Sequence, residues 1–363
     1  MNPKIFILFL LLFTSCLDEI TFNTNDSNDG NLVIQAKLTK GNPSIISVKI
    51  TQIGTLQGEN TVNPIGVNVQ NVRLTNDLGQ NLDLTQQTNV GSYFEEIPNN
   101  AAQFSVETGQ LYQLRILKQN GEEIVSVFEQ MLATPSINSI GLEIKEGVVL
   151  DRFEDEQTFE YLEYHINTNL TTPSSTKRPF LKWNFEGAYQ IWDLQPPEVP
   201  PPLPPRDLCY VTEKLNEEKV VVFDSNLVSD EELQQFAVLE EFLNSRYVYG
   251  YYLTVFQESL SEGAYNYWSQ VAQVTERNGG LFETPAGEIE SNFRNLNQPN
   301  EVIYGYFYAV EQDTLRRYVS PFEVGNPLHL CSEFSQDYDN APSQCKDCLL
   351  WEGSSFTKPD YWE

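Results

Sequence analysis

Residues 112–130, YQLRILKQNGEEIVSVFEQ, contain two short segments in which apolar and polar residues alternate, joined by Asn120-Gly121. Alternation with a period of two is typical of a strand that buries one face. An Asn-Gly pair between two such segments is typical of a tight turn, because both turn residues adopt positive φ angles. This stretch therefore predicts an antiparallel β-hairpin.

The sequence before this hairpin follows the same pattern. ISVKITQI and VNVQNVRLTND alternate in the same way, and the turn signal NDLGQ follows them. Four apolar residues of LVIQAKL fall on one face: Leu32, Ile34, Ala36 and Leu38. Short strands separated by turns over ~100 residues are typical of an immunoglobulin-like sandwich. We therefore expect a mainly β protein with an immunoglobulin-like β-sandwich over residues 32–133.

Residues 134–363 combine strand and helix signals, and Pro135 in ATPSINSI marks the expected boundary. TFEYLEYHINTNL, PFLKWNFEGAYQIWD and NSRYVYGYYLTVFQESL have strand character. PPEVPPPLPP, residues 196–205, predicts an extended exposed loop, because proline fixes φ and lacks an N–H donor. We expect a larger, mixed β-rich domain with two helical insertions and a proline-rich loop.

The first predicted helix covers residues 229–244, SDEELQQFAVLEEFLN. Ser229 and Glu232 have the spacing of a capping box. Four apolar residues then recur at helical spacing: Leu233, Phe236, Leu239 and Phe242.

The second predicted helix covers residues 261–280, starting at Ser261 and ending at the pair Gly279-Gly280, which signals a helix C-terminus. Its aromatic residues Tyr265, Tyr267 and Trp268 are candidates for the wall of a ligand groove. The alternative is that these side chains form the face that packs on a sheet.

The chain has 51 acidic and 22 basic residues among its 363, a formal net charge of −29. Loss of residues 1–15 would remove Lys4 and no acid, so the mature charge would be 21 − 51 = −30. A charge of this sign disfavours nucleic acid and anionic lipid surfaces. Neutral ligands, cations and other proteins remain as expected partners.

The N-terminus has the order of a signal peptide over residues 1–15: Lys4, an apolar run over 5–13, then small residues. The run is too short to span a bilayer, which needs about 20 apolar residues. A polar, acidic segment follows it. Because such a segment buries little apolar area, we expect a flexible tether over residues 16–31.

The residues before Cys16 resemble the bacterial lipobox, in which a signal peptidase cuts before a cysteine that then receives lipid. Phe13 stands where leucine is usual. The resemblance implies acyl chains such as palmitate on Cys16, several of which together anchor a protein stably. An ordinary signal peptide with a chance cysteine is the alternative.

Four cysteines remain for the folded part: Cys209, Cys331, Cys345 and Cys348. An even number in an exported chain favours two disulfides, and three pairings are possible. The preferred pairing is Cys345–Cys348 with Cys209–Cys331. The spacing CKDC also leaves zinc binding or thiol redox chemistry as alternatives.

The sequence has two histidines, His165 and His329, and no HExxH, GxSxG or phosphate-loop motif. Carboxylates are too abundant to single out a catalytic pair. DYDN at 337–340 and NDSNDG at 25–30 resemble parts of calcium loops but lack the bidentate Glu. No catalytic residue, metal site or cofactor is therefore assigned, and we do not expect an enzyme.

Several pieces in order resemble one family, Domain of Unknown Function 4249. They include CLDEI, NLVIQAKLT, VQNVRLTNDLGQ, TGQLYQLRI, KWNFEGAYQIW, AYNYWSQVAQVTERNGGLFETPAGEIESNFRN, EVIYGYFYA and the terminal CKDC. The resemblance implies a lipoprotein of the Gram-negative outer membrane whose gene lies near a TonB-dependent receptor. Asp18 and Glu19 resemble the acidic signal that directs some lipoproteins to the cell surface. Only Cys16 acquires a chemical role from this resemblance.

We therefore expect a lipid-anchored protein on the outer face of the outer membrane, acting as an accessory or binding protein of a TonB-dependent transporter. Two alternatives remain: a surface hydrolase acting on glycan or peptide, and an adhesin or structural surface protein.

Overall fold

The structure is a computed structural model that describes residues 31–52, 64–150, 155–172, 177–194, 206–215, 219–275, 289–328, 331 and 338–362. The predicted signal peptide, Cys16, the tether except Asn31, the proline-rich loop and His329 lie outside these residues. The predicted mainly β fold is confirmed.

The first part of the chain forms short strands, and the predicted hairpin is β8–β9. Lys118 N donates to the Glu122 carbonyl at 2.8 Å to close its turn. Gly121 has a φ of +87°, whereas Asn120 does not adopt a positive φ, so the turn is not the two-residue type predicted. These strands are β1 (Leu32–Lys40), β2 (Ser44–Gln52), β3 (Ile65–Gly66), β4 (Asn71–Asn76), β5 (Asn81–Asp83), β6 (Thr85–Gln86), β7 (Ser92–Ile97), β8 (Leu111–Leu117), β9 (Glu123–Ser126) and β10 (Glu129–Gln130).

The second part has longer strands and helical segments. The strands are β11 (Ile137–Leu150), β12 (Glu156–Asn169), β13 (Phe180–Trp192), β14 (Leu208–Leu215), β15 (Val221–Asp224), β16 (Glu232–Phe242), β17 (Tyr251–Leu260), β18 (Phe293–Asn295), β19 (Ile303–Val319) and β20 (Ser354–Ser355). The helices are α2 (Glu262–Thr275) and α3 (Ser343–Lys346), and short 3-10 turns lie at Ser225–Leu227, Ser245–Tyr247, Pro321–Val324, Tyr338–Asn340 and Cys348–Leu350.

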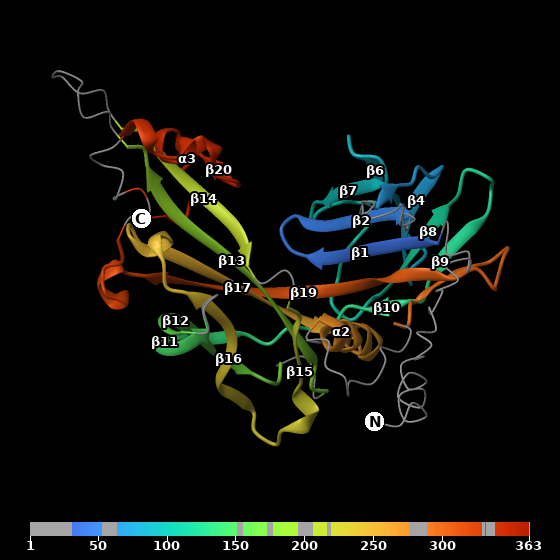
Figure 1. Ribbon diagram of the computed structural model, residues 1–363. Coiled ribbons are helices and arrows are strands. Elements are labelled where there is room, and N and C mark those ends of the chain that lie inside the picture. Colours follow the sequence, from blue (N-terminus) through green and yellow to red (C-terminus); the bar gives the residue numbers. More distant parts are fainter. Residues whose placement is uncertain are drawn as a thin grey trace, which may run out of the picture.

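Strand β19 joins the two parts of the chain. Its first half pairs in parallel with β1, from Ile303 opposite Leu32 onward. Its second half pairs antiparallel with β17, up to Val319 opposite Tyr251. Eleven of the described strands thereby form one large sheet. Nine of them follow the order β20-β14-β13-β17-β19-β1-β2-β7-β6, β15 pairs with β13 and β3 with β2, and β19 crosses the middle of the molecule (Figure 1).

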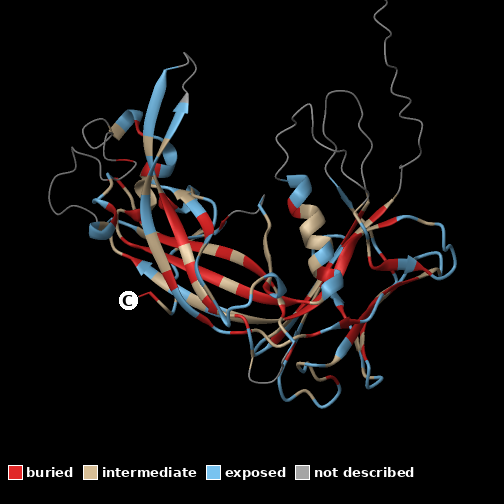
Figure 2. Ribbon diagram, turned by 90° about the horizontal axis from the view of Figure 1, so that it is seen from below, coloured by how far each residue is buried: buried red, intermediate tan, exposed pale blue. Residues whose placement is uncertain are grey.

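Two smaller sheets cover one face of the large sheet and enclose two hydrophobic cores. The sheet β18-β9-β8-β4-β5 packs over β1 and β2, and the sheet β11-β12-β16 packs over β13 and β17. Phe307 of β19 enters the first core and Leu315 packs against the second. These residues are an even number of positions apart on one strand, so they point to the same side. The buried strands form two groups, one on each side of α2 (Figure 2).

The two sheets around the first core draw on both parts of the chain. β18 pairs with β9, and β19 pairs with β1, although both follow residue 134. The segment 32–133 therefore does not supply these sheets alone. The immunoglobulin-like topology and the domain boundary stay predictions.

The predicted helix over residues 229–244 is wrong, because Glu232–Phe242 form strand β16. The residues Thr168, Ile166 and Tyr164 of β12 lie opposite Leu233, Phe236 and Leu239 of β16. Residues two apart on β12 thus face residues three apart on β16, because each interval of β16 contains one extra residue, a β-bulge. Gln235, in the first bulge, has a φ of +49°. Two successive bulges therefore give a strand the apolar spacing of a helix.

Candidate functional site

Helix α2 lies on the face of the large sheet opposite the two cores. It begins directly after Ser261, in agreement with the predicted start, and the predicted end at Gly279-Gly280 lies outside the described residues. Its apolar side packs with Tyr306, Tyr308 and Val310, whereas the intervening Phe307 belongs to the first core. In Figure 1 the helix lies beside the middle of β19, where the two parts of the molecule meet.

A buried carboxylate holds the start of α2. Glu129, only 5% exposed, accepts hydrogen bonds from the hydroxyl of Ser261, from Tyr306 at 2.7 Å and from Asn292 at 3.3 Å. The Ser261 hydroxyl in turn accepts from the backbone N–H of Ala264 at 3.1 Å. Burial raises the pKa of Glu129 although three donors oppose the shift. This network links α2 to β10 and β19.

Gly263 brings the first turn of α2 close to β19. A Cβ atom at this position would lie 2.4 Å from the Tyr306 hydroxyl oxygen, well inside van der Waals contact. The absence of a side chain is therefore required for this approach.

The three aromatic residues predicted on this helix have different surroundings. Tyr265 stacks on Phe180 with centroids 4.4 Å apart, so it packs on the sheet. Tyr267 and Trp268 face Tyr306 and Tyr308, with centroids 4.9 and 5.7 Å apart, and line pockets. The structure thus brings two of the three to a cleft, and ligand binding by them stays a prediction.

Two adjoining pockets lie under α2, and we call them together the α2 cleft. One, of about 440 Å³, is floored by β13 and β17, and the other, of about 620 Å³, by β1, β2 and β7. Both are lined by Lys37, Lys214 and Trp268. Volumes of this size are typical of small-molecule sites.

The α2 cleft is rich in lysine. The sequence has twelve lysines, and five of them line the cleft: Lys37, Lys49, Lys182, Lys214 and Lys219. Among the residues that the structure describes, the acidic ones of its lining are Glu186 and Glu258, so this described lining carries five positive and two negative charges, a net of +3. In a chain with a net charge of −29, the described lining of this cleft on the exposed face of the main sheet is therefore positive.

Glu258 lies at the base of the cleft and is completely buried. Its carboxylate pairs with Lys37, accepts from Asn184 Nδ2 at 2.9 Å, and lies 3.7 Å from Lys182 Nζ. Burial alone would raise the pKa of Glu258, but the two ammonium groups outweigh it and hold the pKa below its usual value. The negative charge of Glu258 is therefore neutralised, and the group of Glu258, Lys37 and Lys182 has one positive charge in excess.

Lys182 is the most buried of these lysines, with an exposure of 5%. Its Nζ donates to Asn184 Oδ1 at 2.5 Å and lies 4.7 Å from the Trp268 ring centroid, over the ring. Burial lowers the pKa of Lys182, and the attraction of Glu258 opposes that shift. Trp268 thus contributes both a wall of the cleft and a cation–π partner.

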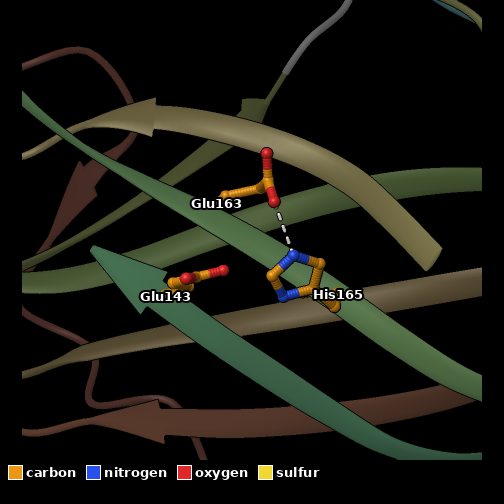
Figure 3. A group of neighbouring side chains, drawn as sticks. All are labelled: Glu143, Glu163 and His165. Atoms are coloured by element: carbon orange, nitrogen blue, oxygen red, sulfur yellow. Dashed lines mark hydrogen bonds and ion pairs between the residues drawn. The ribbon is translucent and has the colours of Figure 1, made fainter. Parts of the chain in front are cut away.

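A second cluster lies away from the cleft, on the outer face of β11 and β12 (Figure 3). The potential ligand atoms of Glu143, Glu163 and His165 lie within 4.8 Å of one another. Lys145 Nζ, however, lies 2.5 Å from Glu163 and 3.7 Å from Glu143. Its hydrogen bond to Glu163, opposed by partial burial, lowers the pKa of that carboxyl. The Lys145 ammonium group and the His165 ring already contact Glu163, so a cation bound there would have to displace them.

The four cysteines form two disulfides, Cys209–Cys348 and Cys331–Cys345. The preferred pairing, with a bridge inside CKDC, is wrong. Cys345 belongs to α3 and Cys348 to the following 3-10 turn, so the two side chains enter different clusters. Cys348 joins the second core beside Cys209 of β14, which it reaches directly.

The comparisons place the chain in a family. A family model with the description Domain of unknown function (DUF4249) matches residues 17–316, and the chain belongs to this family. No curated protein matches the chain. Among the described residues, no helix combines the length and apolar character needed to cross a membrane.

Proposed function

We propose that this protein is a lipid-anchored accessory protein on the outer face of the outer membrane, which holds a ligand in the α2 cleft for a TonB-dependent transporter. The observation that carries the ligand-binding part is the cleft itself. It joins aromatic rings, amides and lysines on a floor of paired strands, and sites on such rigid elements keep their geometry.

The location rests on the N-terminal sequence and on the family resemblance. A signal-like segment ends at Cys16, and the polar residues after it give the folded part distance from the membrane. The resemblance to family members encoded near TonB-dependent receptors supports the partner.

Two measurements on the full-length protein in its native cell test this proposal. Affinity purification from the solubilised outer membrane should recover a TonB-dependent receptor, and Cys16→Ser should release the protein from the membrane fraction. Recovery of wild-type protein without any such receptor would contradict the partnership.

The ligand is tested with two variants of one helix. Wild-type protein and the Tyr265→Ala variant should retain a small molecule detectable by mass spectrometry after denaturation, whereas Tyr267→Ala should lose it. Tyr265 is the matched control because it packs on Phe180 outside the cleft lining. Equal retention by both variants would argue against the cleft.

A further inference from the structure

The charge of the α2 cleft selects the sign of its ligand. Lys49, Lys214 and Lys219 have exposed side chains at the cleft, and the chain around them is strongly acidic. The net negative charge of the chain disfavours an anion in general, whereas a locally positive cleft attracts an anionic ligand.

The polar lining selects a hydroxyl-rich ligand. The larger pocket is lined by four amide or hydroxyl side chains: Gln35, Ser47, Gln87 and Ser92. Such groups both donate and accept hydrogen bonds, as sugar hydroxyls do. Tyr267, beside them, offers a ring on which the apolar face of a sugar can lie.

The floor of the larger pocket disfavours a peptide. β1 is paired on both sides, by β2 and β19, and β2 is paired with β1 and β7. No free strand edge is therefore offered by these two strands for an extended peptide, which commonly binds by adding a strand.

We infer that the α2 cleft binds a short acidic oligosaccharide, with its carboxylates at Lys49 and Lys214 and one sugar ring on Tyr267. This inference rests on the proposed ligand-binding role and specifies the ligand. The neutralised Glu258 beneath keeps Lys37 and Lys182 in place.

Three probes of equal length separate the alternatives by calorimetry on the folded protein. Trigalacturonate carries carboxylates on sugar rings, galactotriose is the neutral sugar, and triglutamate carries carboxylates on a peptide. Trigalacturonate should bind at least about tenfold more tightly than either of the others, and added salt should weaken only the charged part of its binding.

Two double variants with the same change in charge test the lysines. Lys49→Gln with Lys214→Gln should weaken trigalacturonate binding about tenfold, at roughly a factor of three for each rim charge. Lys346→Gln with Lys358→Gln, outside the cleft lining, should leave it unchanged. Circular dichroism and thermal unfolding check that all variants fold. If one of the two cleft substitutions prevents folding, Lys219→Gln takes its place in the double variant.

Equal affinity for the two sugars, equal affinity for triglutamate, or equal loss in both double variants would overturn the inference. Failure of trigalacturonate to bind would also overturn it. The proposed function would then still be judged by receptor recovery and by the molecule that Tyr267→Ala loses.

Discussion

Lys37 of β1 and Glu258 of β17 form an ion pair although 221 residues separate them in the sequence. β19 lies between their strands, so this pair crosses it and ties the two parts of the large sheet together. Glu258 is inaccessible to solvent, which makes the pair matter more than a surface contact.

Replacing Lys37 by methionine should lower the free energy of unfolding by about 3 kcal/mol, because a buried carboxylate loses a partner. Lys40→Met is the matched control on the same strand. Lys40 pairs with Glu311, and both side chains are more than a quarter exposed, so its loss should cost at most about 1 kcal/mol. Chemical denaturation measures both values, and equal losses would contradict a special role for Glu258.

The difference between wild type and Lys37→Met should shrink in acid. The pKa of Glu258 is lowered in the folded state, so its ion pairs add stability above its unfolded pKa of about 4.3. That stability is lost as the pH falls through the folded pKa. The free energies of unfolding of wild type and Lys37→Met, measured by denaturation over this pH range, should therefore converge. A difference that stays constant with pH would contradict the lowered pKa of Glu258.

Glu129 should show the opposite pH dependence. Its pKa is raised in the folded state, so its contribution is fully present below its unfolded pKa and is lost as the pH rises through the folded pKa. Glu129→Gln removes this titration and should gain stability relative to wild type as the pH rises. Glu129→Ala, which leaves Ser261 and Tyr306 unpaired, should be less stable at every pH measured.

Gly263→Ala should destabilise the protein although it is a glycine-to-alanine change in a helix. Such a change normally adds up to about 1 kcal/mol of stability. Here the new Cβ would meet the Tyr306 hydroxyl, and displacement of the helix should cost about 1–3 kcal/mol. Asn266→Ala, at an exposed position of α2, should be neutral or slightly stabilising. Thermal unfolding of both would decide, and a gain at Gly263 would refute the close approach.

The two disulfides should differ in their effect on stability. The chain-entropy estimate gives about 5 kcal/mol for Cys209–Cys348, whose cysteines are 139 residues apart, and about 3 kcal/mol for Cys331–Cys345, 14 apart. Each pair of cysteines is replaced by alanines, and the free energy of unfolding of each variant is measured with denaturant. Peptide mapping without reduction checks the pairing itself, and a linked peptide joining Cys345 to Cys348 would contradict it.

Local patterns predicted those elements whose ladder or helix is regular. The β8–β9 hairpin and helix α2 follow from alternation, turn residues and the Ser261 cap. β16 could not be recognised, because its bulges depend on the partner strand β12 and convert a period of two into one of three. Its pattern became ambiguous only through a tertiary contact.

The cleft was partly predictable for the same reason. Tyr267 and Trp268 belong to one helix, so their place on it could be predicted from the local sequence. The lysines come singly from β1, β2, β13 and β14 and from the segment before β15, and alternation places them on one face only once those strands are paired. Net charge, a property of the whole chain, concealed a positive region of this size.

The position of β19 also sets an order of events for a chain that leaves the ribosome N-terminus first. β1 lacks its parallel neighbour until residues 303–319 have arrived, some 260 residues later than the end of β1. Until then it presents an open strand edge to the surrounding chains, which is a hazard for misassembly. A chain of this topology therefore needs protection of its early half until β19 has been made, and chaperones that bind unfolded chains can supply that protection.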